Sequence, residues 1–322
     1  MCRYEARAWW AGIGGTEANF SHTTCPPYYL FKNTYSSLVS IELNQITNVS
    51  SVPQRSPFRY PGGKTWLVPR IRQWLNSLPD KPKEFIEPFA GGGIISLTVA
   101  FEQLANHVTM VELDEQVAAV WQTILNGDAD WLANKIISFQ MSADAVAELL
   151  SNEPRSLKHK AFQTIVKNRV NRGGILAPGA GMIKQGEKGK GLRSRWYPET
   201  LKRRILQIAE IRDRITFIAG DGLEILTENI NRPDAVFFID PPYTAAGKKA
   251  GKRLYKYAEL NHEELFKLAR ETAGDFLMTY DNTQEVKAWA NDYGFDWQAV
   301  AMKNTHHAKM TELLISRNLD WF

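Results

Sequence analysis

Apolar and polar positions along residues 58–129 follow two alternating periodicities. Residues 66–78 carry apolar side chains at helical spacing and predict a helix. Residues 84–87 predict a short strand, which ends before Pro88. A glycine-rich turn follows, then a helical pattern over residues 94–104 and a second apolar run over residues 108–111. This order predicts a βαβ unit with parallel strands and a right-handed crossover.

The pattern resumes after residue 214 and predicts the rest of the sheet. Strands are expected over 215–219, 235–239, 276–280 and 313–316, with helices over 262–272 and 284–293. Such alternation is typical of an α/β fold with a mainly parallel, doubly wound sheet. A chain of 322 residues is long enough for one such domain and a smaller embedded lobe.

Residues 130–214 interrupt this rhythm. Helices are expected over 131–139, 143–150, 161–170 and 198–212, and seven glycines between residues 173 and 191 predict a mobile surface loop. Between residues 151 and 214, 16 lysines and arginines stand against 5 aspartates and glutamates, although the net charge of the whole chain is only +4. A basic lobe on an acidic body is typical of a protein that binds nucleic acid.

These patterns divide the chain into three parts. Residues 58–129 and 215–322 form a catalytic domain, residues 130–214 a mostly helical insert, and residues 1–57 an extension of unknown role. Both cysteines, Cys2 and Cys25, lie in the extension, so we expect no disulfide framework and no metal site in the core. This use of cysteine predicts a reducing, cytoplasmic environment. No apolar run approaches the ~18 residues that cross a membrane, so we expect no membrane partner.

Asp240-Pro241-Pro242-Tyr243 follows the apolar run 235–239 and indicates the chemistry. At the carboxyl end of a strand these residues lie where open α/β sheets bind ligands. The Asp240 carboxylate and the Pro241 carbonyl can accept the two hydrogens of an exocyclic amine, while the Tyr243 ring stacks on a planar base. Accepting those hydrogens favours attack of the amine nitrogen on an electrophilic methyl group. A purely structural proline turn is the alternative.

The turn at Pro88-Phe89-Ala90-Gly91-Gly92-Gly93 can bring the backbone close to a ligand. Glu112 ends the next strand, where a carboxylate suits the two hydroxyls of a ribose, although a solvated acid would look the same. Asp221 can reach a cofactor or can cap a helix. Gly62-Gly63-Lys64-Thr65 ends like a phosphate loop, but that loop also needs a glycine at residue 58 and a strand before it, and both are missing. A turn that aims Tyr60 and Lys64 at a cleft is therefore favoured.

Taken together, these motifs resemble the Dam-like family of adenine-N6 DNA methyltransferases, in its alpha arrangement. The resemblance covers residues 58–318 and includes Phe58-Arg59-Tyr60-Pro61-Gly62-Gly63-Lys64, Glu87 to Gly93, Glu112-Leu113-Asp114, Asp240 to Tyr243, and Glu312-Leu313-Leu314-Ile315. It implies a Rossmann-like methyltransferase fold, S-adenosylmethionine as cofactor, and duplex DNA as partner. A cognate restriction endonuclease and a bacterial or phage source are further expectations.

By position, the resemblance implies cofactor-binding roles for Tyr60, Lys64, Pro88, Phe89, Gly91, Glu112, Asp221 and Asp240, and catalytic roles for Asp240, Pro241, Pro242 and Tyr243. Two basic segments are expected to contact DNA, through Arg169, Arg172, Lys184, Lys188, Arg193, Arg195, Lys248, Lys249, Lys252 and Arg253. Three alternatives remain: methylation of the cytosine N4 amine, methylation of RNA or protein, and a catalytically silent DNA-binding module. The sequence does not indicate the DNA target or the oligomeric state.

Overall fold

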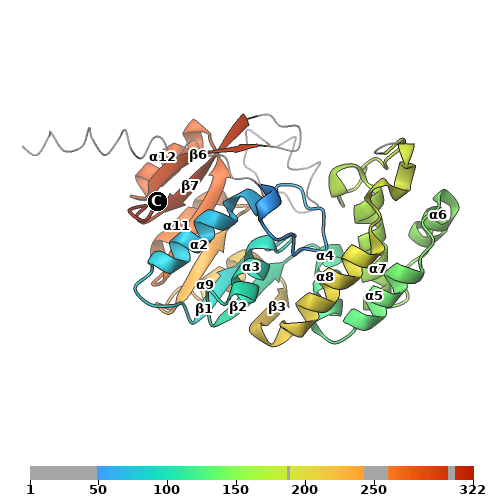
Figure 1. Cartoon of the computed structure of the whole chain (residues 1–322). Coiled ribbons are helices and arrows are strands. Elements are labelled where there is room, and N and C mark those ends of the chain that lie inside the picture. The colour runs from blue at the N-terminus through green and yellow to red at the C-terminus, as the bar shows by residue number, and fades with distance from the viewer. Residues whose placement is uncertain (1–48, 187–188, 243–259, 304–308) are drawn as a thin grey trace, which may run out of the picture. The chain divides into compact units, whose positions relative to one another are not determined.

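A seven-stranded sheet of order β3-β2-β1-β4-β5-β7-β6 organises the computed structural model (Figure 1). The structure describes residues 49–186, 189–242, 260–303 and 309–322, which belong to one compact unit, Leu43–Phe322. The strands are β1 Glu84–Glu87, β2 His107–Glu112, β3 Ile215–Ala219, β4 Ala235–Ile239, β5 Asp275–Asp281, β6 Asp296–Lys303 and β7 Lys309–Ser316. The extension before residue 49, Lys188, Tyr243, Lys248, Lys249, Lys252 and Arg253 lie outside the described residues.

Strands β1 to β5 are parallel, and β7 runs antiparallel to both β5 and β6. Phe85 of β1 lies between Val108 of β2 and Val236 of β4. All five residues of β4 are buried, because a central parallel strand is covered on both faces. The prediction of a mainly parallel, doubly wound α/β sheet is confirmed, with the strand order of a Rossmann-like methyltransferase fold.

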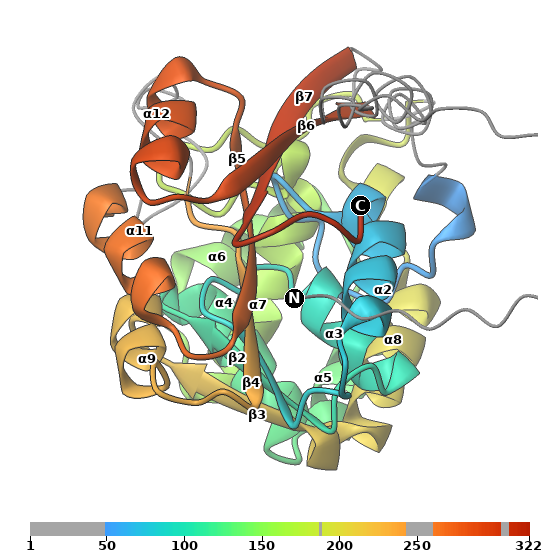
Figure 2. The ribbon, with the colours of Figure 1, turned by 90° about the vertical axis from the view of Figure 1, so that its left-hand side faces the viewer.

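Helices cover both faces of the sheet (Figure 2). One face packs against α2 Val68–Ser77, α3 Ile94–Glu102 and α4 Glu115–Leu125, and the other against α9 Gly222–Glu228, α11 His262–Glu271 and α12 Gln284–Asp292. Side chains alternate between the faces along each strand, so that Phe238 joins the first core and Phe237 the second. Strand β6 and helix α9 were not predicted, since β6 is an edge strand with a short, alanine-rich apolar run and α9 has only seven residues.

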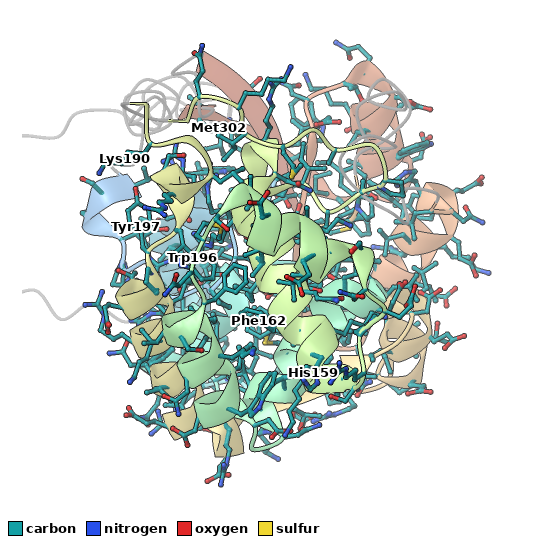
Figure 3. The ribbon with its side chains drawn as sticks, turned by 90° about the vertical axis from the view of Figure 1, so that its right-hand side faces the viewer. His159, Phe162, Lys190, Trp196, Tyr197 and Met302 are labelled. Atoms are coloured by element: carbon teal, nitrogen blue, oxygen red, sulfur yellow. The ribbon has the colours of Figure 1, made fainter. Side chains whose placement is uncertain are left out.

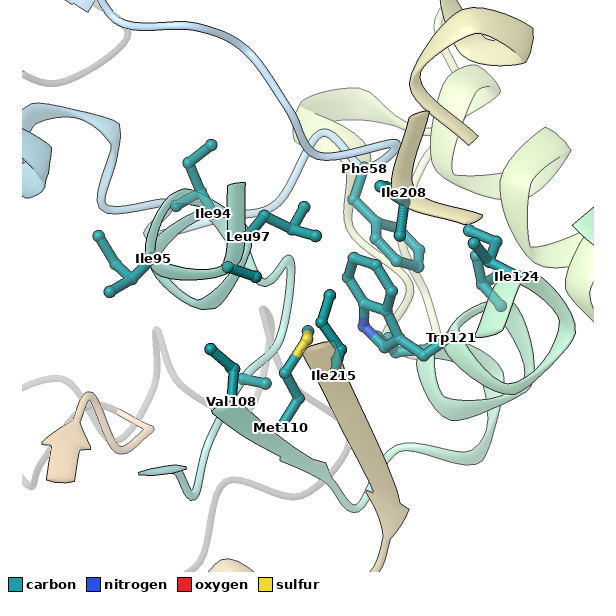
Figure 4. Packing of buried hydrophobic residues seen from close by; sticks show 14 of the residues in the cluster. Phe58, Ile94, Ile95, Leu97, Val108, Met110, Trp121, Ile124, Ile208 and Ile215 are labelled. Carbon is teal, nitrogen blue, oxygen red and sulfur yellow. The ribbon is translucent and has the colours of Figure 1, made fainter. Parts of the chain in front are cut away.

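The insert folds as α5 Ala129–Ser138, α6 Ala143–Ser151, α7 Leu157–Val170 and α8 Pro198–Glu210. Helix α7 packs on α4, and α8 packs on α5 and α4. Ile208 of α8 belongs to the same buried cluster as Trp121 of α4, Phe58 and Met110 of β2 (Figure 4). The insert therefore shares a continuous core with the sheet. Among the described residues, no helix is long and apolar enough to cross a bilayer.

Candidate active site

The strand order of the sheet reverses between β1 and β4, whose carboxyl ends lie side by side. Strands β2 and β3 continue on one side of β1, whereas β4 and β5 lie on the other. Ligands of open α/β sheets bind at such switch points. The turn that begins at Pro88 follows β1, and Asp240, Pro241 and Pro242 follow β4, so two of the predicted motifs meet at this edge.

A direct hydrogen bond joins the glycine turn to Glu112. The Gly91 N–H donates to Glu112 Oε2 over 2.8 Å, and the Asp114 N–H donates to Oε1 over 2.8 Å. Burial raises the pKa of Glu112 to about 7, although these backbone N–H groups favour the charged carboxylate. Gly91 has a φ of 48°, and a Cβ there would lie 2.5 Å from the Tyr60 ring. Tyr60 thus packs directly on the turn, and the site needs a glycine at residue 91.

Lys64 is buried beside the catalytic carboxylate predicted from the sequence. Its Nζ lies 2.9 Å from Asp240 Oδ1 and 3.6 Å from Glu312 Oε2, and its side chain is only 3% exposed. The Thr279 hydroxyl of β5 also donates to Asp240 Oδ1, over 2.7 Å. Among the described residues both donors reach the same oxygen of Asp240, which fixes the orientation of the carboxylate.

Further acids surround this ion pair. Burial raises the pKa of Glu312 to about 7, and it also raises the pKa of Asp281. In both cases Lys64 favours the charged carboxylate and Asp240 opposes it. Lys64 is therefore the cation that allows several carboxylates to lie close together at this edge of the sheet.

Glu87, the last residue of β1, binds the start of α3, which follows the glycine turn. Its buried carboxylate accepts hydrogen bonds from the Ser96 N–H, over 3.0 Å, and from the Ser96 hydroxyl, in the first turn of α3. Burial raises the pKa of Glu87 to about 8, despite both bonds. The carboxyl is thus largely protonated at neutral pH and anchors the start of α3.

Replacing Glu87 by glutamine is expected to flatten the dependence of stability on pH. In the unfolded chain Glu87 ionises near its ordinary pKa of 4.5, but the folded protein keeps the proton up to about pH 8. Stability from this group therefore falls as pH rises between these values, and Glu87→Gln removes that loss. Thermal unfolding from pH 5 to 9 measures the effect, with the exposed Glu148→Gln as control. Parallel curves for Glu87→Gln and the wild type would contradict the assignment.

Asp221 caps a helix and lies close to the glycine turn. Its carboxylate accepts a hydrogen bond from the Leu223 N–H over 2.8 Å, so the capping alternative is realised at the start of α9. A Cβ at Gly222 would lie 2.2 Å from the Pro88 carbonyl oxygen, which shows how closely α9 approaches the turn. The cofactor-binding role of Asp221 stays a prediction.

Sequence reasoning gave no role to three residues of the site, although Leu113 and Glu312 stand in motifs that the resemblance includes. Thr279 and Glu312 come from β5 and β7 and contact Asp240 and Lys64, which no local pattern indicates. Leu113 is 45% exposed although it lies between Glu112 and the buried Asp114. The sequence shows a leucine directly after a strand-end acid, but only the structure shows that its side chain is exposed, where it can cover the flat face of a ligand.

The basic residues of the insert fall into two groups. Arg172, Lys184 and Arg193 are exposed and Arg195 is half-buried. Arg169 is buried and donates to the Pro57 carbonyl, and burial lowers its pKa. We therefore assign Arg169 to the packing of the insert rather than to the DNA surface. Figure 3 shows the face of the insert, with Lys190 and Tyr197 on the segment that leads into α8.

Comparison with known proteins identifies the family of this chain. Residues 60–305 match the model of the D12 class N6 adenine-specific DNA methyltransferases. The Type II methyltransferase M.MjaIII of Methanocaldococcus jannaschii is 22% identical over 261 residues, which cover 75% of this chain and 86% of that protein.

Two solved structures also match at low similarity. A methyltransferase from Geobacter sulfurreducens has a TM-score of 0.35 and 12% identity, with 89% of this chain and 98% of that chain covered. A proposed RNA methyltransferase from Pyrococcus horikoshii has a TM-score of 0.37 and 13% identity, with 89% and 100% covered. The family match spans most of the chain and includes the turn, Glu112, Asp240 and the insert. This chain belongs to the D12 class of N6 adenine-specific DNA methyltransferases.

Proposed function

We propose that this adenine-specific DNA methyltransferase binds S-adenosylmethionine beside the glycine turn and methylates the N6 amine of an adenine flipped out of duplex DNA. The observation that carries the proposal is the meeting of Asp240 with the Gly91–Glu112 pair at one edge of the sheet. Asp240 supplies a hydrogen-bond acceptor for the amine, and Glu112 supplies an acceptor for the hydroxyls of a ribose. Flipping costs a few kcal/mol, which contacts to the base and the backbone offset.

The residues of the pocket fit the cofactor. The Glu112 carboxylate, which already accepts from the Gly91 N–H, would hold the ribose hydroxyls, and the exposed Leu113 would cover a face of the adenine ring. Tyr60, Pro88, Phe89 and Gly91 form the floor, while Lys64 and Asp221 border it. When bound, S-adenosylmethionine supplies an electrophilic methyl group.

Asp240 activates the target amine. Lys64 and Thr279 hold Oδ1, so Oδ2 accepts one amine hydrogen, and the Pro241 carbonyl accepts the other. These bonds strengthen as the nitrogen becomes tetrahedral, which directs the stabilisation to the transition state. Pro242 shapes the exit from β4, and Tyr243 stacks on the base. The nitrogen gains the methyl group as the bond between that group and the cofactor sulfur breaks, so S-adenosylhomocysteine leaves, and the nitrogen then releases one of its two original protons to water.

Identifying the methylated nucleoside tests this function. The purified chain is incubated with S-adenosylmethionine and duplex DNA, and the digested DNA is analysed by mass spectrometry. N6-methyladenine is expected. N4-methylcytosine, methylation of an RNA duplex alone, or DNA binding without methylation would each replace the proposal by one of its alternatives. A cognate endonuclease and a cytoplasmic location in a bacterium or a phage-infected cell remain parts of the proposal.

Glu112→Ala is expected to weaken binding of S-adenosylmethionine about 30-fold. Hydrogen bonds to a charged carboxylate contribute about 2 kcal/mol in such sites, which corresponds to that factor. Titration calorimetry without DNA measures the dissociation constant, and the exposed Glu210→Ala serves as control. An unchanged dissociation constant for a folded Glu112→Ala protein would remove Glu112 from the pocket.

Exposed basic residues of the insert are expected to bind phosphates of the DNA backbone. Replacing Arg172, Lys184 and Lys190 together by alanine should lower the slope of log K against log salt by roughly 2 to 3, since each phosphate contact contributes about 0.9. Fluorescence anisotropy between about 50 and 200 mM salt measures the slope. The control is the double variant Lys81→Ala with Lys83→Ala, since both residues precede β1 and lie near the amino ends of the parallel strands. Equal slopes for triple variant and wild type would place the DNA elsewhere.

A further inference from the structure

Residues 56–60, here called the connector, lie between the insert and the glycine turn. The connector precedes Lys64 in the chain and carries Tyr60. Its backbone is held by side chains of the insert, and its own side chains pack on the turn. It is therefore a direct physical link between the insert, which is proposed to contact DNA, and the turn, which is proposed to bind the cofactor.

Three insert residues hold the connector backbone. Arg204 Nη1 donates to the Ser56 carbonyl over 2.9 Å, and Arg169 Nη2 donates to the Pro57 carbonyl. Asn168, near the end of α7, bonds to both backbone groups of Arg59 in the connector. Its Oδ1 accepts from the Arg59 N–H over 3.0 Å, and its Nδ2 donates to the Arg59 carbonyl over 2.9 Å.

Asn168 also bonds to the loop of the insert that follows α7. Its Nδ2 donates to the Gly174 carbonyl over 2.7 Å, and the side chain is fully buried. The contacts among Asn168, Arg59 and Gly174 are here called the junction. A Cβ at Gly174 would lie 2.0 Å from the Arg59 carbonyl oxygen. Gly174 thus lies directly against the Arg59 carbonyl, and the Asn168 amide bonds to both backbones and sets the position of Arg59.

The other side of the connector packs on the cofactor turn. The Ser56 hydroxyl donates to the Gly92 carbonyl, and the Phe58 ring packs edge-on against Trp121 with 5.5 Å between ring centres (Figure 4). Trp121 Nε1 in turn donates to the Gly91 carbonyl over 3.0 Å. The Tyr60 ring lies against Gly91 and Gly92. A shift of the connector would therefore displace the turn that carries the proposed cofactor pocket.

We propose that Asn168 is a positioning residue that, through the Arg59 backbone, holds Tyr60 and the glycine turn in the geometry that binds the cofactor. The inference rests on the proposed function, since it assigns the pocket to S-adenosylmethionine. Asn168 lies too deep to contact DNA or cofactor itself. Its effect is transmitted by the backbone of the connector, and so it differs from that of the residues that line the pocket.

Two variants disturb the junction from opposite sides. Asn168→Asp keeps the size of the side chain but replaces the donor that faces the Arg59 and Gly174 carbonyls by an acceptor. Gly174→Ala pushes a methyl group against the Arg59 carbonyl. The control for Gly174→Ala is Gly179→Ala, because Gly179 has a similar φ of 82° but nothing within 4 Å of an added Cβ. Exposed Asn152→Asp is the control for Asn168→Asp.

The readouts separate positioning from general stability. Calorimetry with S-adenosylhomocysteine and no DNA should show at least about 10-fold weaker binding for both junction variants, and unchanged binding for both controls. Hydrogen exchange without ligand should speed up in residues 56–64 and 88–93 of the junction variants only. The kcat with DNA should fall, while the dissociation constant for DNA stays within about twofold.

Several results would overturn the proposal. Junction variants that melt at a lower temperature but bind S-adenosylhomocysteine like the wild type show a merely structural role for Asn168. If the variants bind DNA more weakly but bind S-adenosylhomocysteine like the wild type, Asn168 and Gly174 act only on the insert and not on the cofactor site. If Gly174→Ala does not fold, Asn168→Asp decides. A wild-type chain that binds S-adenosylhomocysteine but methylates no DNA refutes the proposed function, while the binding and exchange measurements still test the positioning role.

Discussion

Asp240→Ala is expected to lower kcat for DNA methylation by about 10³-fold while binding of S-adenosylmethionine and DNA persists. The reason is that Asp240 acts where charge develops on the amine, and removing one such group commonly lowers kcat by about 10² to 10³. Its carboxylate is held by Lys64 and Thr279 at Oδ1, and this fixes the direction in which Oδ2 accepts the amine hydrogen. Single-turnover methylation with saturating cofactor and DNA measures the chemical step.

The variant Asp240→Asn sharpens this test. Asparagine keeps the volume of the side chain, but its amide can present hydrogens to an amine that also offers hydrogens, so the loss should be similar. The exposed Asp292→Ala, at the end of α12, is the control and should retain wild-type activity. An Asp240→Ala protein that folds, binds DNA and methylates within about tenfold of the wild type would disprove the role of Asp240.

Lys64→Met is expected to destabilise the protein by about 3 kcal/mol at pH 8, in addition to abolishing activity. The substitution leaves Asp240 and Glu312 close together without their cation, and breaking a buried ion pair on one side typically costs about 3 to 5 kcal/mol. We use the lower end because Asp240 is 22% exposed and partly screened by solvent. Urea denaturation measures the free energy of unfolding.

The destabilisation by Lys64→Met should depend on pH. The pKa of Glu312 is already raised to about 7 in the folded protein, and loss of Lys64 raises it further. Glu312 is then protonated when folded but ionised when unfolded above about pH 4.5. The stability of the variant therefore falls as pH rises from about 4.5 through the folded pKa, so its deficit relative to the wild type is larger at pH 8 than at pH 6.

Two further variants test the cause of this effect. Glu312→Gln in the Lys64→Met background should restore part of the stability at pH 8, since it removes one of the unpaired carboxylates. Lys83→Met is the control, because its ion pair with Asp234 spans 3.9 Å at the surface and should contribute less than about 1 kcal/mol. A Lys64→Met protein with the same deficit at pH 6 and pH 8 would show that lost packing, not lost charge, causes the destabilisation.

Local patterns were sufficient to predict most of the fold. The apolar run at β4 and the glycine turn after β1 are continuous in the chain, so their periodicity identified them. The edge strand β6 pairs with β7 alone, and its apolar run is short, since only Ala299 to Met302 are consecutive and two of these four residues are alanines. The place of Asp240 and Glu112 was predictable because the carboxyl ends of parallel strands meet at one edge of the sheet.

Contacts between distant segments were not predictable. Lys64, Thr279 and Glu312 come from a turn and two strands, and only the folded sheet brings them to Asp240. Composition placed Arg169 with the DNA-binding residues of the insert, but α7 turns it into the interior, where it binds the connector. A count of charges reports how many basic residues a segment has and not which of them face water.

The sequence by itself therefore determined the strand and helix order, the glycine turn, the strand-end carboxylates and the family to which they point. Each of these depends on residues that are neighbours in the chain. Only the tertiary structure decided that Lys64 pairs with Asp240, that Leu113 is exposed beside Glu112, and that Asn168 joins the insert to the cofactor turn. Such contacts depend on how helices and strands pack, and packing brings together residues that no local pattern relates.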